Sequence, residues 1–164
     1  MNSTEYEALV SKVATKMTNY PELIRLGTVN YGSKNKWRGA SGFCHQVDVS
    51  LENDRDVLLV ECKHWKENLK AETFLVQLAR VIDIATGPDS KNRAVRGAIV
   101  TSRGFQRGVY KLEEHYKRCV SLFKVSSDEE FTVISHTHFI DVSSITSNGE
   151  VGTPTIMQHP PLSS

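Results

Sequence analysis

Residues 57–65 read VLLVECKHW. The first four residues are apolar, and a short apolar run of this kind is typical of a strand that enters a protein core. A carboxylate, a thiol and an ammonium group follow at once, those of Glu61, Cys62 and Lys63. Because charged side chains are rarely buried without a partner, the stretch predicts a buried strand that ends at a polar site.

A second strand is predicted just before this one, over Cys44–Leu51. The two segments are separated by Asn53–Asp56 (NDRD), and Asn and Asp favour turns because their side chains bind nearby backbone groups. If these four residues form the turn of a hairpin, Glu52 pairs with Val57, and this pairing fixes the register of both strands.

This register predicts that two carboxylates meet. Asp48 lies opposite Glu61, and directly opposed residues have Cβ atoms about 4.5–5.5 Å apart. Two carboxylates at that distance repel each other, and one takes up a proton unless a cation lies between them. Hard oxygen ligands of this kind suit Mg²⁺, with Mn²⁺ as a substitute. We therefore expect a divalent metal site at Asp48 and Glu61, with the carbonyl oxygen of Cys62 as a further ligand.

Two more side chains belong to the predicted site. Gln46 lies opposite Lys63 in the register, and Lys63 shares a strand face with Glu61 because side chains alternate along a strand. An ammonium group near a bound metal can position water and stabilise the negative charge that develops on a phosphoryl oxygen. The alternative is that Glu61 and Lys63 form an ordinary surface ion pair, worth under about 1 kcal/mol.

The other predicted elements give the order of the fold. A helix is predicted over Thr4–Met17, where Thr4 and Glu7 match a capping box, and a weak strand over Leu26–Tyr31. The clearest helix is Ala71–Ala85. The further elements are the strand Gly97–Thr101, the helix Gln106–Lys117 and the strands Cys119–Val125 and Phe131–Ser135. Strands that alternate with helices predict an α/β fold with parallel crossovers.

Positive charge is concentrated in two stretches of the chain. The segment Lys91–Arg118 has eight Lys or Arg residues and two Glu residues. The segment Gly32–Gly42, predicted to be a loop, is rich in Gly, Ser and positive charge and has no acidic residue. Such stretches suit the phosphate backbone of a nucleic acid, and they also occur as solvated faces. The residues of these stretches that we expect to contact nucleic acid are Lys34, Lys36, Arg38, Arg103, Gln106 and Arg107.

Composition and length suggest one globular domain. The chain has 164 residues, of which 39% are hydrophobic and 24% are charged, ordinary values for such a protein. We expect no membrane segment and no secretory signal, and the three cysteines without CxxC spacing favour a cytoplasmic location. From Ser143 the sequence is rich in Ser, Thr, Gly and Pro, which predicts a domain of residues 1–142 and a loose tail of residues 143–164.

Three blocks of the sequence resemble a known family. They are Gly42–Val49 (GFCHQVDV), Val60–Lys63 (VECK) and Val100–Gln106 (VTSRGFQ), and the helix Ala71–Ala85 lies between the last two. In this order they resemble the Mrr-like restriction endonuclease domains of the PD-(D/E)XK nuclease superfamily. The resemblance covers roughly residues 5–125. It implies a restriction endonuclease-like α-β-β-β-α-β core, in which a mixed central sheet is flanked by helices.

The resemblance also implies roles for residues of the predicted site. Asp48 and Glu61 would bind Mg²⁺, and Lys63 would serve the attacking water in the hydrolysis of DNA phosphodiester bonds. Glu7 matches an acidic residue of the first helix that some relatives direct at the metal. Its capping-box role with Thr4 is an equally good explanation.

The chain departs from the family pattern at two positions. Val47 stands before Asp48 where the motif has Pro, a position that varies in the family. Gln77 matches the Gln of a Gln-x-x-x-Tyr motif found in some relatives, but Val81 stands where that motif has Tyr.

The predicted function is therefore that of a magnesium-dependent DNA endonuclease of the restriction type. Target recognition would come from DNA structure, from a partner protein or from a second copy in a homodimer. Two alternatives share the fold, namely a structure-specific nuclease like the Holliday-junction resolvases and a DNA-binding or assembly module without catalysis. The opposed carboxylates of Asp48 and Glu61 favour an enzyme, because a binding module has no use for them.

Overall fold

A computed structural model of the chain describes residues 1–17, 27–116, 119–125, 131–135, 138–141 and 155–158. The elements among these residues are α1 (Ser3–Met17), β1 (Thr28–Tyr31), β2 (Lys36–Arg38), β3 (Cys44–Gln46), β4 (Val49–Glu52), β5 (Asp56–Lys63), α2 (Ala71–Ala85), η1 (Pro88–Ser90), β6 (Ala94–Thr101), α3 (Arg107–Tyr116), β7 (Val120–Val125), β8 (Phe131–Ser135), β9 (His138–Asp141) and β10 (Thr155–Gln158).

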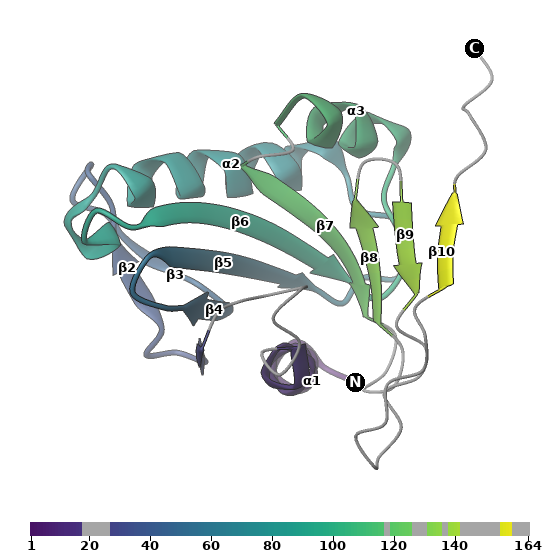
Figure 1. The fold of residues 1–164 in the computed structure, drawn as a ribbon, viewed down its shortest axis with the longest axis horizontal. Coiled ribbons are helices and arrows are strands. Elements are labelled where there is room, and N and C mark those ends of the chain that lie inside the picture. The colour runs from purple at the N-terminus through teal and green to yellow at the C-terminus, as the bar shows by residue number, and fades with distance from the viewer. Residues whose placement is uncertain (18–26, 117–118, 126–130, 136–137, 142–154, 159–164) are drawn as a thin grey trace.

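Within the described residues, eight strands form one mixed sheet in the order β1-β4-β5-β6-β7-β8-β9-β10. Strands β5, β6 and β7 are parallel, and the other neighbours are antiparallel. Helices α2 and α3 join the parallel strands and lie on one side of the sheet, whereas α1 lies on the other side (Figure 1). The predicted α/β fold, a mixed sheet flanked by helices in the order α-β-β-β-α-β, is confirmed.

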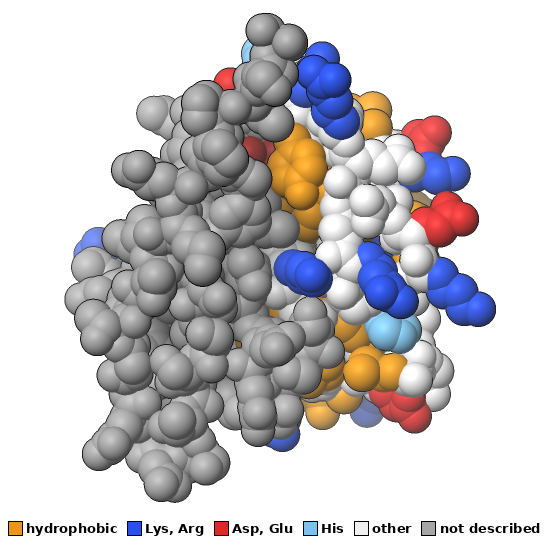
Figure 2. Space-filling view, turned by 90° about the vertical axis from the view of Figure 1, so that its right-hand side faces the viewer, with side chains coloured by type: hydrophobic (Ala, Val, Ile, Leu, Met, Phe, Trp, Pro, Cys, Tyr) orange, Lys and Arg blue, Asp and Glu red, His pale blue; other side chains and the backbone are white. Residues whose placement is uncertain are grey.

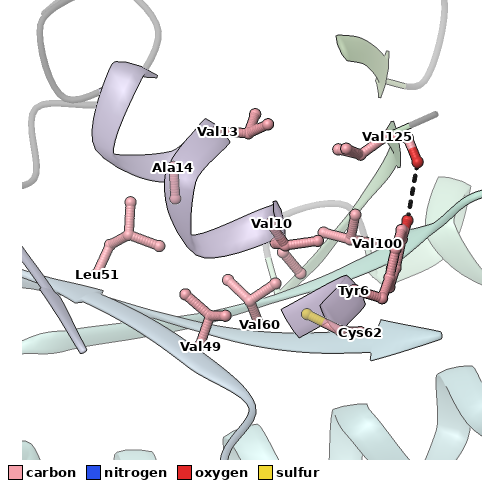
Figure 3. Packing of buried hydrophobic residues seen from close by; sticks show 11 residues of the cluster. Tyr6, Val10, Val13, Ala14, Val49, Leu51, Val60, Cys62, Val100 and Val125 are labelled. Atoms are coloured by element: carbon pink, nitrogen blue, oxygen red, sulfur yellow. Dashed lines mark hydrogen bonds between the residues drawn. The ribbon is translucent and has the colours of Figure 1, made fainter. Parts of the chain in front are cut away.

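Strand β5 separates two apolar layers because its side chains alternate between the faces of the sheet. On the α1 face, Val60 and Cys62 pack in one cluster with Tyr6 and Val10 of α1 (Figure 3). The hydroxyl group of Tyr6 donates a hydrogen bond of 3.0 Å to the carbonyl oxygen of Val125 on β7. This bond satisfies the buried hydroxyl and fastens α1 to the sheet.

The opposite face of β5 carries the predicted site at its end. Val57 and Leu59 pack there with Trp37, Val81 and Ile84. Glu61 and Lys63 continue the same alternation, so they lie on the α2 side of the sheet. The apolar part of β5 therefore anchors the strand, and the polar part emerges where β5 ends.

The hairpin register is confirmed for β4 and β5, where Glu52 pairs with Val57 and Val49 pairs with Val60. The single strand predicted over Cys44–Leu51 is wrong, because β3 and β4 belong to different sheets and the chain passes from one to the other at Val47 and Asp48. Val47 is held there by Asn35, whose carbonyl oxygen accepts its N–H and whose side-chain amide donates to its carbonyl oxygen, each over 3.0 Å.

The predicted loop Gly32–Gly42 contains the strand β2, which pairs with β3 in a separate two-stranded sheet. Trp37 at its centre is buried among the residues that cover Leu59. Gln46 pairs with Lys36 in this small sheet, so the expectation that it lies opposite Lys63 is wrong. The burial of one large aromatic side chain accounts for a strand in a segment with the composition of a loop.

The predicted capping box of Thr4 and Glu7 is also wrong. Helix α1 begins at Ser3, and Asn2 and Glu5 form the reciprocal pair. The backbone N–H of Glu5 donates to the side-chain oxygen of Asn2 over 2.9 Å, and the backbone N–H of Asn2 donates to the carboxylate of Glu5 over 2.7 Å. Asn ranks above Thr as an N-cap residue, so the helix starts earlier and Glu7 has no capping role.

The predicted tail of residues 143–164 lies mostly outside the described residues. Its described part, β10, pairs with β9 at the edge of the sheet. The division into a domain of residues 1–142 and a tail stays a prediction. Among the described helices, none combines the length and the apolar character that crossing a membrane requires.

Candidate functional site

Asp48 stands in the break between β3 and β4, next to the end of β5. One of its carboxylate oxygens, Oδ2, accepts a hydrogen bond of 2.8 Å from the backbone N–H of Cys62. The backbone N–H of Gly32 donates to the carbonyl oxygen of Asp48 over 3.4 Å. Together with the two bonds between Asn35 and Val47, these contacts fix the carboxylate beside the segment Glu61–Lys63.

The surroundings of Asp48 disfavour its negative charge. Burial raises its pKa, and the negative charges of Glu61 and Glu7 add to this effect. The hydrogen bond from Cys62 and the charge of Lys63 act in the opposite direction without cancelling it, and the pKa of Asp48 is raised to about 6. Glu7 of α1 thus acts electrostatically on the predicted site, consistent with its lack of a capping role.

Glu61 is buried, with 8% of its surface exposed, yet its charge is compensated. Its Oε1 lies 2.6 Å from the ammonium nitrogen of Lys63, and its Oε2 accepts a hydrogen bond from Nη1 of Arg80. Burial alone would raise the pKa of Glu61, but the charge of Arg80 and the hydrogen bond and charge of Lys63 outweigh it. The pKa of this carboxyl is therefore held below its usual value.

Arg80 is a site residue that the sequence did not reveal. It projects from α2, and the Oε1 atom of Gln77, one turn earlier, accepts a hydrogen bond of 3.0 Å from the same Nη1. The amide nitrogen of Gln77 donates to the carbonyl oxygens of Leu59 and Ala98, over 2.8 and 3.3 Å. Gln77 is 1% exposed. Its position on the apolar face of α2 was the feature of the sequence that could have pointed to a polar cluster there.

The donor set agrees in its chemistry with the metal that the resemblance implies. Asp48 and Glu61 supply hard oxygen atoms, and the raised pKa of Asp48 indicates negative charge that a cation would compensate. Among the described residues, however, no group of three or more His, Cys, Asp or Glu side chains could hold a metal ion. The donor chemistry fits Mg²⁺, provided that Glu61 exchanges one of its two cations for the ion. The carbonyl of Cys62 as a ligand stays a prediction.

The hairpin of β2 and β3 places three of the predicted nucleic-acid contacts on the surface. Lys36 and Arg38 are exposed on the same face as Gln46, whose side-chain amide donates to the carbonyl oxygen of Gly32 over 2.8 Å. Lys34 is exposed in the turn that precedes β2. This face contains no acidic residue of the hairpin.

The tip of this hairpin is fastened to the end of α2 through Asp83. The backbone N–H and the hydroxyl of Ser41 donate to the two carboxylate oxygens over 2.8 and 2.7 Å, and Nε2 of His45 lies 2.7 Å from Oδ2. These hydrogen bonds, that of His45 first, lower the pKa of Asp83 to about 2. A Cβ atom on Gly39 would lie 1.9 Å from the same carboxylate, so the hairpin packs against α2 as closely as Gly allows.

The other predicted contacts lie where β6 ends and α3 begins. Arg103, Gln106 and Arg107 are exposed there. The backbone N–H of Gln106 donates to the carbonyl of Leu69 over 2.9 Å, which joins this turn to the segment that follows β5. In the view of Figure 2, Lys and Arg side chains stand both in the middle and at the edge of the described surface, and most acidic side chains lie toward its edge. Lys63 pairs with Thr101 across β5 and β6, so the turn follows the same sheet edge as the site.

Comparison with known proteins shows a likeness of fold and does not assign the chain to a family. No protein-family model matches the chain, and no curated protein sequence matches it significantly. Among solved structures, the chain is similar to AF1548, a protein of unknown function, with a TM-score of 0.53 and 14% identity over 71% of this chain and 56% of that chain.

Two further solved structures match with lower scores. One is a repair endonuclease from Pyrococcus abyssi, with a TM-score of 0.46 and 18% identity over 72% of this chain and 47% of that chain. The other is R.BspD6I2, the small subunit of the heterodimeric restriction endonuclease R.BspD6I, with a TM-score of 0.39 and 11% identity over 74% of this chain and 62% of that chain. The chain thus spans less than two thirds of the length of each structure it matches.

Proposed function

We propose that the protein is a magnesium-dependent DNA endonuclease that hydrolyses phosphodiester bonds, of the restriction type that the Mrr-like blocks suggest. The observation that carries the proposal is the junction of Asp48 with Glu61 and Lys63 at the end of β5. A carboxylate with a raised pKa, a compensated carboxylate and an ammonium group within one site are the means for metal-assisted hydrolysis.

Each residue of the site has a separate role in this proposal. Asp48 and Glu61 would hold the ion, and a bound Mg²⁺ would supply positive charge and lower the pKa of a bound water. The ammonium group of Lys63 orients the attacking water and donates a hydrogen bond to the developing negative charge. Lys63 is held for this task by Glu61 and by the ring of Trp65, whose centroid lies 5.8 Å from its nitrogen.

DNA is the proposed substrate because exposed cations lie on two segments that adjoin the site residues, one in the chain and one in the sheet. Those of the β2–β3 hairpin precede Asp48 in the chain, and those of the turn after β6 follow the same sheet edge as Lys63. A single site cuts one strand of a duplex, so we include a second copy of the chain or a partner protein in the proposal for double-strand cleavage. Either would also supply target recognition.

Cleavage assays on linear, nicked, branched and methylated DNA with Mg²⁺ or Mn²⁺ test the proposal. Wild-type protein should cleave at least one substrate, Lys63→Ala should not, and Lys66→Ala, which changes an exposed neighbour, should cleave as wild type does. Cleavage confined to branched DNA would favour the resolvase-like alternative. Absence of cleavage on all four substrates with both metals would contradict an endonuclease.

A second candidate, a DNA-binding module without catalysis, is favoured by one observation. Glu61 already forms ion pairs with both Lys63 and Arg80, an arrangement that stabilises the fold without a metal. Such a module would bind DNA equally well with and without Mg²⁺, and its melting temperature would not respond to the ion. A nuclease of the proposed type shows the opposite behaviour in both measurements.

A further inference from the structure

Arg80 is the second cation that contacts the carboxylate of Glu61. Glu61 carries one negative charge, and Lys63 lies 2.6 Å from it, close enough to compensate that charge alone. Arg80 places a second cation on the other oxygen of the same carboxylate. Its side chain is 17% exposed, and Arg keeps its proton under all ordinary conditions. Lys63 and Arg80 together therefore carry one positive charge more than the charge of Glu61 alone.

Only the Nη1 atom of the Arg80 guanidinium group makes hydrogen bonds within the described part of the chain. Nη1 donates both to Glu61 and to Gln77, which uses the two N–H groups of that nitrogen. The group has three further N–H donors, on Nε and Nη2, and within the described part of the chain none of them has a hydrogen-bond partner. These donors form one edge of the planar fork, the edge that binds a phosphate in bidentate fashion.

Gln77 fixes the position of Arg80 relative to the sheet. Its amide nitrogen is tied to backbone carbonyls of β5 and β6, so its Oε1 atom points along α2 toward Arg80 with little freedom. Arg80 is thereby kept at the site whether or not Glu61 holds it. Arg55 has the same side chain but is exposed in the turn before β5, at the opposite end of that strand from the site, and it serves as a matched control.

We propose that Arg80 is an exchangeable counter-ion of Glu61, which releases the carboxylate to the divalent ion and binds a phosphate of the DNA through its Nε and Nη2 edge. The inference rests on the proposed nuclease function and assigns to it a phosphate-binding residue on α2. Lys63 keeps its contact with Glu61, because it acts on the water. Arg80 gives up its contact with Glu61 and stays near the site through Gln77.

Two consequences follow from exchange. Arg80 and the metal compete for Glu61, so removing Arg80 tightens metal binding, by about fivefold or more for a coupling of ordinary size. Release from Glu61 makes the whole charge of Arg80 available to the phosphate, so its contribution to DNA binding grows when the metal is bound. A residue that served the fold alone would change neither quantity in this way.

The first experiment measures Mg²⁺ and Mn²⁺ binding by calorimetry without DNA. Arg80→Ala and Arg80→Gln should bind the ion at least about fivefold more tightly than wild type, whereas Arg55→Gln should match wild type. Arg80→Gln keeps a polar partner for Gln77, so the test stands even if Arg80→Ala folds poorly, and thermal unfolding checks both variants. Unchanged or weaker metal binding in a folded Arg80→Gln protein would overturn the exchange.

The second experiment measures DNA affinity against salt concentration in a Lys63→Ala background, in which the DNA stays intact. With Mg²⁺, Arg80→Gln should reduce the slope of log K against log salt by about 0.9, the value for one phosphate contact. Without metal the loss of slope should be smaller. A loss of slope that is equal with and without metal, or no loss with metal, would overturn the inference.

These outcomes are separable from failure of the proposed function. A wild-type protein that neither binds a divalent ion nor cleaves DNA would contradict both. A wild-type protein that does both, with Arg80 variants that behave like Arg55→Gln, would contradict only the role of Arg80.

Discussion

The two carboxylates of the candidate site lie side by side in opposite surroundings. In what we call the paired half, Glu61 meets the cations of Lys63 and Arg80, and its pKa is held low. In the acidic half, formed by Asp48 and Glu7, Asp48 has no ion pair among the described residues, and its pKa is raised to about 6. The uncompensated charge of the metal-free protein is thus localised at Asp48, where a cation is most needed.

The largest expected effects concern cleavage, and they separate the two halves. Asp48→Asn and Lys63→Ala should each reduce the cleavage rate at least about 100-fold. Only Asp48→Asn should also abolish the rise in melting temperature that Mg²⁺ causes by binding the native state, because Lys63 is not a ligand. Rates come from single-turnover assays and melting temperatures from calorimetry. An Asp48→Asn protein that cleaves like wild type would contradict the proposed role of the acidic half.

The second comparison uses unfolding in urea without metal. Glu61→Gln should destabilise the protein by about 2 kcal/mol, because it leaves two partly buried cations without their partner; both are partly exposed, so the cost falls below that of a fully buried pair. Asp48→Asn should not destabilise it, because the side-chain oxygen of Asn can still accept the N–H of Cys62. Equal loss of stability in the two variants would show that the halves do not differ.

The pH dependence of stability should reveal the acidic half directly. The pKa of Asp48 is about 6 in the folded protein, above the ordinary value of 3.8, so the folded state binds more protons than the unfolded state between these values. Its contribution to stability is therefore present at low pH and is lost as pH rises from about 4 through 6, by on the order of 2 kcal/mol after screening by solvent. Asp48→Asn should remove this decline, which urea unfolding at several pH values measures. A decline that persists in the variant would assign it to another group.

The sequence predicted the framework of this site for local reasons. Alternation along β5 and the NDRD turn set the β4–β5 register, which is confirmed, and they predicted Glu61 and Lys63 on one face. The parallel strands followed from the alternation of strands and helices. These features depend on neighbours in the chain, which a single sequence displays.

The parts that the sequence did not reveal depend on distant contacts. Strand β2 forms because Trp37 is buried against residues of β5 and α2. The sequence of the segment Gly32–Gly42 does not indicate that burial. Arg80 is one of several cations in the sequence, and only the packing of α2 on β5 brings it to Glu61. In the sequence, Gln77 matches only the first residue of a family motif, whereas its place in the structure follows from hydrogen bonds to two backbone carbonyls.

The smallest expected effect decides the role of Glu7. Its charge raises the pKa of Asp48 from α1, so Glu7→Gln should weaken Mg²⁺ binding by about threefold to tenfold through lost attraction. Stability should stay within about 0.5 kcal/mol of wild type. Asn2→Ala is the matched control, because it removes the observed cap of the same helix; it should cost about 1 kcal/mol and leave metal binding unchanged. Calorimetric titration and urea unfolding of both variants give the four values. If Glu7→Gln instead destabilised the protein as Asn2→Ala does and left Mg²⁺ binding unchanged, Glu7 would be a residue of the helix alone, and the acidic half would consist of Asp48.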